Sequence, residues 1–455
     1  MASAQQERLW IQRSVIHREK FQRLQSMPLG DACKQIGGYI VCRQDQFKVA
    51  QPSRDGTCVY VGLRVSDGKE VAVKCMLADI CDDVADNETK IFNMIKMEKS
   101  PHVVRYRDYI KQDPFIYIIL ELCEYSLAQY VRRIPVGNLP VLNPQKMIRE
   151  ILTGLDVLHK QGHEDKEMIL HRDLKPDNVL VDVEGCIRLA DFGVSKKVGE
   201  GRSTSYTSSK GNAEWQAAES IPIDGENQPV VYKRKSDIQV AGMLVYYVLT
   251  NGRHPFGDIS YERPNNIYRG NPVSLESNTA ISAVEKDLVS WLIEKNFEDR
   301  PFAYEALKHP YLMSIEDQFR FLVVVGNEPE VARSGVRSDV GNKLNSYAGD
   351  YPNGWRQKID ARVINAMSKF ADQYNSNDIT RLLRFLRNVK DHICDNRIPP
   401  DVRQIVGDPA HYFLDSNRFA TLPMIVHRVL RNQAKQVARS GGEAWIRRST
   451  LQPFF

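Results

Sequence analysis

Short apolar runs dominate the pattern from residue 38 to residue 122. The runs CVYVGLRV (58–65), EVAVKCM (70–76) and FIYIILEL (115–122) are rich in Val, Ile, Tyr and Phe, which is typical of strands. One helix-like stretch, 85–98, lies between the last two runs, and after residue 122 the apolar positions recur with the helical period. The pattern therefore predicts an α+β chain in which a small β-rich lobe is followed by a larger helical lobe.

The first 25 residues combine bulky apolar side chains with basic ones. Between residues 5 and 25 these two kinds of residue alternate in the manner of an amphipathic helix. Such a segment can lie on a membrane surface, act as a transit peptide, or pack on the chain's own core or on a partner. Glu7 and Glu19 interrupt the basic face, which favours packing on the core or on an unidentified partner helix.

Length and composition limit the class of protein. A chain of 455 residues suits two or three domains, and its net charge of +5 permits a polyanionic partner without demanding one. The eight cysteines form no CxxC pair, which is typical of reduced thiols in the cytosol. No run approaches the roughly 20 apolar residues that a membrane-spanning helix needs. We therefore expect a soluble, cytoplasmic protein with no membrane span.

The strongest chemical signal is HRDLKPDNVL at 171–180, followed by ADFG at 190–193. Transfer of a phosphoryl group needs a base for the attacking hydroxyl and oxygen ligands for Mg²⁺. Asp173 can accept the hydroxyl proton, and Asn178 and Asp191 supply hard oxygen ligands for the metal. Lys175 can neutralise charge on the phosphate that moves.

Together these residues resemble the catalytic and metal loops of eukaryotic Ser/Thr protein kinases. The resemblance implies a bilobal kinase fold that binds ATP or ADP with Mg²⁺. It makes Lys74 the lysine that clamps the phosphates and Glu88 its ion-pair partner. It also makes Leu120–Cys123 the hinge, so that Glu121 and Cys123 are candidate nucleotide-binding residues. Asp237 and Arg300 resemble the two residues that brace the large lobe.

Two departures from the kinase pattern put the activity in doubt. The phosphate-covering loop should contain three glycines, but Gln51 and Ser53 occupy two of the positions and only Gly56 remains. Side chains at these two positions could weaken or slow phosphoryl transfer. The expected Ala-Pro-Glu is Ala217-Ala218-Glu219, in which Glu219 can still pair with Arg300 but the turn lacks the rigidity of proline. The Ser/Thr-rich loop at 200–212 is either a flexible polar loop or a site of autophosphorylation.

A second constellation lies near the C-terminal end. RNA can be cut without metal when its own 2′-hydroxyl attacks the adjacent phosphate, which needs an acid for the leaving oxygen and cations or donors for the phosphorane. Asn388 and His392 are four residues apart and share one face if a helix continues there. Arg387 sits about 100° round that helix and is long enough to reach the same phosphate.

The surrounding text, SIEDQFRFLVVVGNEPEV, NGWRQKID, RLLRFLRNVKDHI and VGDPAHYF, resembles the all-α kinase-extension nuclease domain. That domain occurs in the inositol-requiring kinase/endoribonuclease of the unfolded-protein response and in ribonuclease L. The resemblance makes His392 the general acid, lets Arg387 and Asn388 hold the scissile phosphate, and places Tyr374 at the family's active-site tyrosine. It implies an RNA substrate, 2′,3′-cyclic phosphate and 5′-hydroxyl products, and activation by self-association into a homodimer or higher oligomer.

Some residues near this constellation keep two interpretations. Trp355 is expected to anchor the core rather than to stack on a base. Arg381, Arg384 and Lys390 could contact RNA phosphates or form an ordinary polar helix face.

The sequence thus predicts an N-terminal helical extension (1–37), a protein kinase domain (38–313), a nuclease domain (314–435) and a mobile C-terminal tail (436–455). Two other hypotheses remain open. One is a Ser/Thr kinase whose extension only dimerises, and the other is a nucleotide-sensing scaffold, which the altered glycine loop favours. The intact residues of both constellations argue against these alternatives.

Overall fold

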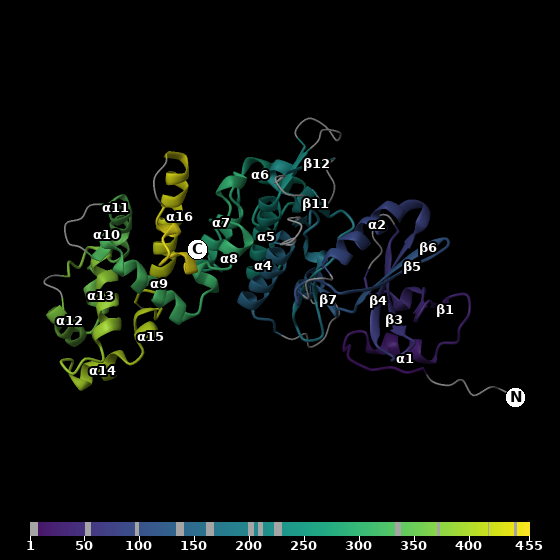
Figure 1. Cartoon of the computed structure of the whole chain (residues 1–455), viewed down its shortest axis with the longest axis horizontal. Coiled ribbons are helices and arrows are strands. Elements are labelled where there is room, and N and C mark those ends of the chain that lie inside the picture. Colours follow the sequence, from purple (N-terminus) through teal and green to yellow (C-terminus); the bar gives the residue numbers. More distant parts are fainter. Residues whose placement is uncertain are drawn as a thin grey trace. The chain divides into compact units, whose positions relative to one another are not determined.

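The computed structural model describes most of the chain and resolves it into two compact units. The described residues are 8–50, 56–95, 100–132, 141–160, 168–198, 204–207, 213–222, 230–332, 338–370, 374–416, 418–440 and 444–455. Unit 1 comprises Met1–Ile281 and Val289–Tyr304, and unit 2 comprises Ser282–Leu288 and Glu305–Phe455. Figure 1 labels their helices and strands.

Unit 1 begins with a six-stranded antiparallel sheet in the order β1-β2-β3-β4-β6-β5. Its strands are β1 (Cys33–Ile36), β2 (Tyr39–Cys42), β3 (Cys58–Arg64), β4 (Glu70–Leu77), β5 (Tyr106–Gln112) and β6 (Phe115–Glu121), and helix α2 (Ala78–Ile95) follows β4 directly. The three expected strands and the expected helix are therefore present, although the helix begins earlier than predicted. The register places Lys74 between Val59 on β3 and Ile118 on β6, so Lys74 projects from a central strand.

The N-terminal segment packs on this sheet, but only part of it is helical. Helix α1 spans Arg18–Ser26 and buries Phe21 and Leu24 in the core of the sheet. The expected helix over residues 5–25 is too long, because residues 8–17 form no helix and distant carboxylates bind part of their backbone. Glu70 accepts the amide of Ser14 at 2.7 Å, and Glu124 accepts the amide of Ile16 at 2.7 Å. Packing on the chain's own core is therefore the correct interpretation of this segment.

The remainder of unit 1 is mainly helical. Its helices are α3 (Leu127–Arg132), α4 (Pro144–Lys160), α5 (Arg234–Leu249) and α6 (Arg263–Arg269), and α7 (Ala283–Leu292) and α8 (Ala303–Ala306) each extend into both units. Small antiparallel sheets join β7 (Tyr125–Ser126), β9 (Val179–Val181) and β10 (Ile187–Leu189), then β8 (Met168–Leu170) with β11 (Lys196–Val198), and β12 (Thr204–Thr207) with β13 (Val230–Lys233). Helix α5 is buried on nearly every side, which explains its continuous apolar run.

Unit 2 is helical throughout its described residues. Its helices are α9 (Ile315–Asn327), α10 (Pro329–Ala332), α11 (Asp339–Asn345), α12 (Ala361–Met367), α13 (Ile379–His392), α14 (Pro400–Val406), α15 (Pro409–Phe413) and α16 (Leu422–Ser440). One core joins them, and Trp355 lies fully buried within it, as expected of an anchor. The indole N–H of Trp355 donates to the carbonyl of Asn375 at 3.0 Å and so fixes the chain immediately after Tyr374.

The C-terminal residues differ from the expected mobile tail. Helix α16 continues to Ser440, and in residues 444–455 the side chains of Leu451 and Phe454 are buried in the core of unit 2. Leu451 and Phe454 follow a polar stretch and belong to no helical pattern of apolar residues. The sequence of the tail therefore resembled a polar terminus. The predicted fold class is confirmed: an α+β chain with a bilobal fold followed by an all-α domain.

Candidate functional site

One buried carboxylate binds the backbone of the loop that carries Asp173. Asp237, on α5, accepts the backbone amides of His171 at 2.9 Å and Arg172 at 3.0 Å, and the ring of His159 at 3.0 Å. Arg172 adopts a φ of 68°, a left-handed conformation that costs free energy and is seen where surrounding contacts enforce it. The two amide bonds to Asp237 hold the loop in this conformation just before Asp173, and the bond from His159 holds Asp237 in place.

Asp173, Lys175 and Asn178, three residues of the kinase-like constellation, form one hydrogen-bonded group. The Nζ of Lys175 lies 2.6 Å from Oδ2 of Asp173, and the Nδ2 of Asn178 donates to the same oxygen at 2.9 Å. Because the amide nitrogen of Asn178 faces Asp173, its carbonyl oxygen is the part that can bind a hard cation.

Lys74, Glu88 and Asp191 form a second group on unit 1. The Nζ of Lys74 lies 2.7 Å from the fully buried carboxylate of Glu88, so the expected ion pair is present, and 2.9 Å from Asp191. The charge of Lys74 holds the pKa of Asp191 at about 2, although burial opposes this. Asp191 has a φ of 66°, and its side chain stays two-fifths exposed, so one carboxylate oxygen can bind a cation.

The expected nucleotide-binding segment is the connection that follows β6. Glu121 accepts the amide of Arg105 at 2.9 Å through its carboxylate, and Cys123 is buried, which raises the pKa of its thiol. A nucleotide would therefore meet this segment through main-chain groups rather than through these side chains. Gly56 is described, whereas Gln51 and Ser53 of the same loop lie outside the described residues, as does most of the Ser/Thr-rich loop.

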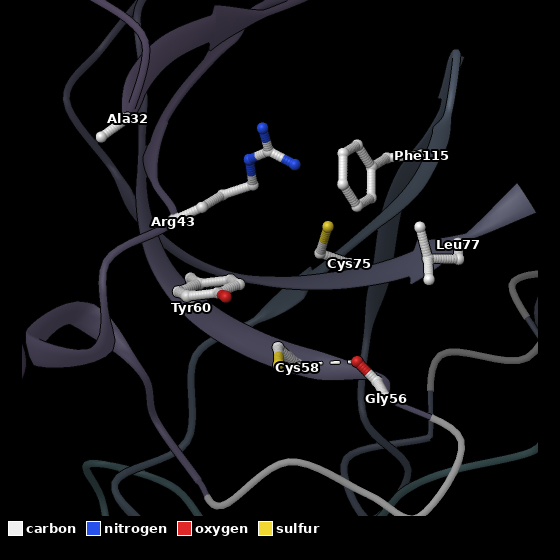
Figure 2. A pocket seen from close by; sticks show the side chains of 8 residues that line it. All are labelled: Ala32, Arg43, Gly56, Cys58, Tyr60, Cys75, Leu77 and Phe115. Atoms are coloured by element: carbon white, nitrogen blue, oxygen red, sulfur yellow. Dashed lines mark hydrogen bonds between the residues drawn. The ribbon is translucent and has the colours of Figure 1, made fainter.

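A cavity of about 270 Å³ lies beside Gly56 (Figure 2). It is lined by Ala32, Arg43, Gly56, Cys58, Tyr60, Cys75, Leu77 and Phe115. Cys75 follows Lys74 on β4, and successive side chains of a strand point to opposite faces. The part of the cavity beside Cys75 therefore lies on the face of the sheet away from Lys74, and Gly56 is the predicted nucleotide-binding residue that also lines it.

The altered Ala-Pro-Glu motif is compensated in the structure. Glu219 forms a bidentate pair with the buried Arg300 at 2.8 and 2.9 Å, as predicted. The backbone N–H of Ala218 donates to the buried side chain of Gln239 at 2.8 Å. Proline has no N–H, so alanine at this position gains a hydrogen bond where the usual motif has a rigid ring. The expectation of a less rigid turn was made from the loss of proline alone and did not take this hydrogen bond into account.

In unit 2 the structure links three of the four predicted nuclease residues through hydrogen bonds. The Nδ2 of Asn388 donates to the hydroxyl of Tyr374 at 2.6 Å, and Arg387 donates to Oδ1 of Asn388 at 3.0 Å. Tyr374 and Asn388 are buried, and burial raises the pKa of the Tyr374 phenol. Tyr374 therefore stays protonated near neutral pH and can donate its O–H to a phosphate oxygen.

His392 is the last residue of α13, one turn beyond Asn388, as the helical spacing required. Its Nδ1 lies 3.1 Å from Oδ2 of Asp395, and its ring stacks on Phe370 with centroids 4.2 Å apart and planes inclined by 7°. The side chain of His392 is 30% exposed, and Nδ1 rather than Nε2 is the nitrogen that contacts Asp395. Neither Asp395 nor Phe370 was singled out from the sequence.

Asn327 is a further member of the site. Its Oδ1 accepts the Nε of Arg387 at 2.7 Å, which fixes the guanidinium from the side of α9. Helices α9 and α13 approach closely at Gly326, where an added Cβ would lie only 2.6 Å from the carbonyl oxygen of Leu383. The VGNE text marked the family resemblance, but the spacing alone did not indicate that Asn327 contacts Arg387.

The basic residues beside the site keep their two interpretations. Arg381 donates to the carbonyl of Val331 at 3.0 Å, Arg384 is partly buried, and Lys390 is exposed. Over the described ranges, no helix is long and apolar enough to cross a membrane. Within the same ranges, no three His, Cys, Asp or Glu side chains gather as a metal site would require.

Comparison with known families supports both constellations. The family model described as a protein kinase domain matches residues 55–312, and the model described as Ribonuclease 2-5A matches residues 318–439.

Similar curated proteins carry both activities in their names. The human serine/threonine-protein kinase/endoribonuclease IRE2 is 31% identical over 393 residues, which are 84% of this chain and 40% of the relative. The rice protein IRE1, of the same description, is 29% identical over 431 residues, or 90% of this chain and 45% of the relative. The Caenorhabditis elegans protein ire-1 is 30% identical over 387 residues, or 82% and 38%. The chain spans less than half the length of these relatives.

Proposed function

Because this chain belongs to the protein kinase family, and within it to the kinase/endoribonucleases of the IRE1 and ribonuclease L group, we propose that it joins two activities. One is a nucleotide-binding Ser/Thr protein kinase. The other is a metal-independent endoribonuclease that leaves 2′,3′-cyclic phosphate and 5′-hydroxyl ends. The observation that carries the proposal is the hydrogen-bonded series Tyr374, Asn388 and Arg387 with His392 one helical turn away.

The nuclease residues suit in-line attack by the 2′-hydroxyl. The new bond forms between O2′ and phosphorus, the P–O5′ bond breaks, and O5′ takes a proton from Nε2 of His392. The 2′-hydroxyl proton passes to water. Arg387 offers its guanidinium fork to the phosphate oxygens, and the O–H of Tyr374 donates to the same group. Asn388 holds both of these side chains in place through its amide.

The kinase residues suit a nucleotide and Mg²⁺. Mg²⁺ usually binds one or two protein oxygens together with phosphate oxygens, and Asp191 and the carbonyl of Asn178 offer that set. When bound, the metal would neutralise charge on the phosphates of ATP or ADP. Lys74 would orient those phosphates, and Asp173 would accept the proton of an attacking hydroxyl while Lys175 faces the transferred group.

The proposed control is self-association. A kinase unit loaded with nucleotide would favour a dimer or a higher oligomer, and RNA cutting would follow the population of that assembly. The mild positive charge is compatible with RNA as the substrate. All eight cysteines are free in the structure, which supports a reducing, cytoplasmic compartment.

The test is cleavage of a labelled RNA stem-loop in EDTA at protein concentrations that drive association. The native chain is compared with His392→Ala, and the ends of the products are identified. Cutting by the native chain alone, with a cyclic phosphate on the product, supports the proposal. Silence from both proteins is followed by the same assay with Mg²⁺ and nucleotide, and silence there contradicts the nuclease.

A nucleotide-sensing scaffold is the second candidate, because Gln51 and Ser53 replace two glycines of the phosphate-covering loop. In that case the chain would bind ATP, measured as a rise in melting temperature, yet would transfer no phosphate to itself and cut no RNA.

A further inference from the structure

We infer that Asp395 and Phe370 are positioning residues that hold the imidazole of His392 with Nε2 toward the leaving 5′-oxygen. The inference rests on the proposed nuclease function and adds the residues that orient its acid. It is drawn from the contacts of His392 itself.

His392 and three neighbouring side chains form a closed set of four. Asp395 accepts from Nδ1 of His392 at 3.1 Å and from Nη2 of Arg397 at 3.1 Å. The guanidinium of Arg397 lies 4.8 Å from the centre of the Phe370 ring, and that ring stacks on His392 at 4.2 Å. Each side chain therefore contacts two others, and rotation of the His392 ring would break both the stack and the hydrogen bond.

The backbone fixes the distance between acid and carboxylate. The amide of Asp395 donates to the carbonyl of His392 at 2.9 Å, so the chain turns tightly just after α13 ends. Ile398 donates in turn to the carbonyl of Asp395 at 2.9 Å. This double turn holds the carboxylate beside Nδ1 without help from a long, mobile side chain.

The chemistry of the pair assigns the proton. An ionised carboxylate only accepts hydrogen bonds, so Nδ1 of His392 carries a hydrogen and Nε2 is the nitrogen that exchanges its proton. In the proposed step Nε2 donates this proton to O5′ as the P–O5′ bond breaks. The acid form of the ring carries a hydrogen on each nitrogen, so Nδ1–H donates to Asp395 while Nε2–H faces O5′. With the ring rotated away, Nε2–H would no longer face the leaving oxygen, which would depart without a proton.

An ordinary surface ion pair is the alternative explanation. Exposed pairs contribute only about 0–1 kcal/mol, and the carboxylate of Asp395 is 34% exposed. That explanation predicts no effect on chemistry. It also does not account for the nearly parallel stack of Phe370 on the same imidazole. A histidine that only caps a helix end does not require such a stack.

The experiment separates protonation of the leaving group from every other role. One stem-loop RNA is made in two forms, ordinary and with sulfur replacing the bridging 5′-oxygen at the cleaved bond. A thiol has a pKa of about 8.5 and so leaves as a thiolate without an acid. Single-turnover cleavage in EDTA is measured for the native full chain, His392→Ala, Asp395→Ala, Asp395→Asn and Phe370→Leu. The control is Asp401→Asn, an exposed carboxylate on α14 that pairs with Arg362 at 3.8 Å.

We expect Asp395→Ala to slow cleavage of ordinary RNA by roughly 10–100-fold, the usual effect of removing a partner that orients a functional histidine. Asp395→Asn keeps an acceptor for Nδ1, so its loss is smaller, and Phe370→Leu slows the same substrate in the same direction. On the sulfur-containing RNA all of these variants, His392→Ala included, cut at close to the native rate. Asp401→Asn matches the native chain on both.

Two results overturn the inference alone: native-rate cleavage of ordinary RNA by Asp395→Ala, or an equal loss on both substrates. The second would show that Asp395 supports folding or RNA binding instead. If the native chain cuts neither RNA, even with Mg²⁺ and nucleotide, the proposed function fails and the inference fails with it.

Discussion

Replacing Asp287 by asparagine should destabilise unit 2 severely. Asp287 lies in the first turns of α7 and is only 3% exposed. Its carboxylate accepts Nε2 of His309 at 3.0 Å, Nε of Arg428 at 2.7 Å, and both terminal nitrogens of Arg431 at 2.7 Å. The substitution keeps the shape of the side chain but removes its charge and half of its acceptor capacity.

The magnitude follows from burial. Removing one partner of a buried ion pair costs about 3–5 kcal/mol, because the remaining charge stays in a poor solvent. Arg431 is 9% exposed and bears this cost fully, whereas Arg428 is 32% exposed and is partly relieved by water. We therefore expect a loss of about 3–4 kcal/mol, which lowers the melting temperature of a unit of this size by roughly 6–16 °C.

The assay is differential scanning calorimetry on the full chain, with Asp317→Asn as the control. Asp317 pairs with Arg320 on an exposed face of α9, so its loss should cost no more than about 1 kcal/mol. A cleavage assay on the same samples connects stability to activity. Equal melting temperatures for Asp287→Asn and the native chain would refute the reasoning, since the cluster would then contribute no net stabilisation.

Three further outcomes are expected. Burial lowers the pKa of His309 to about 4, so the unfolded chain binds more protons than the folded chain between about pH 6.5 and 4. The free energy of unfolding should therefore fall as the pH drops through that window, by up to about 1.4 kcal/mol per pH unit from this group. A melting temperature that stays constant across the window would contradict this prediction. Ala218→Pro should cost about 1–3 kcal/mol in chemical denaturation, because Gln239 loses its donor, whereas Ala218→Ser should not. Glu124→Ala should release the amide of Ile16 and make the N-terminal segment more sensitive to protease than it is in the native chain, and unchanged digestion would show that the segment is held by its apolar contacts alone.

The kinase constellation was predictable because its chemistry fixes residue types at fixed spacings. Lys74, Asp173 and Asp191 are recognised in order along the chain, and the structure pairs Lys74 with Glu88, as the pattern indicated. It also joins Lys74 to Asp191 and Lys175 to Asp173, which the pattern did not indicate. The strands were equally predictable from the sequence, since Val, Ile and aromatic residues in short runs suit a pleated surface.

Contacts set by distant backbone could not be predicted in the same way. Residues 8–17 carry apolar side chains at helical spacing, yet they form no helix, and Glu70 and Glu124 from elsewhere in the sequence bind the amides of Ser14 and Ile16. The closeness of Asn327 to Arg387 likewise depends on two helices meeting at Gly326, which no local pattern reports.

The boundary between the two predicted domains shows why a motif and a folding unit need not end together. The expected boundary at residue 313 and the family match to residue 312 follow the kinase pattern along the chain. Asp287 and His309 lie before that boundary. The carboxylate of Asp287 nevertheless forms ion pairs with Arg428 and Arg431 on α16, and it also contacts His309. A fragment that begins at residue 314 would keep both arginines and lose the buried carboxylate between them. The two arginines of α16 therefore depend on a carboxylate that the sequence assigns to the kinase, and unit 2 extends across the predicted boundary to include Ser282–Leu288.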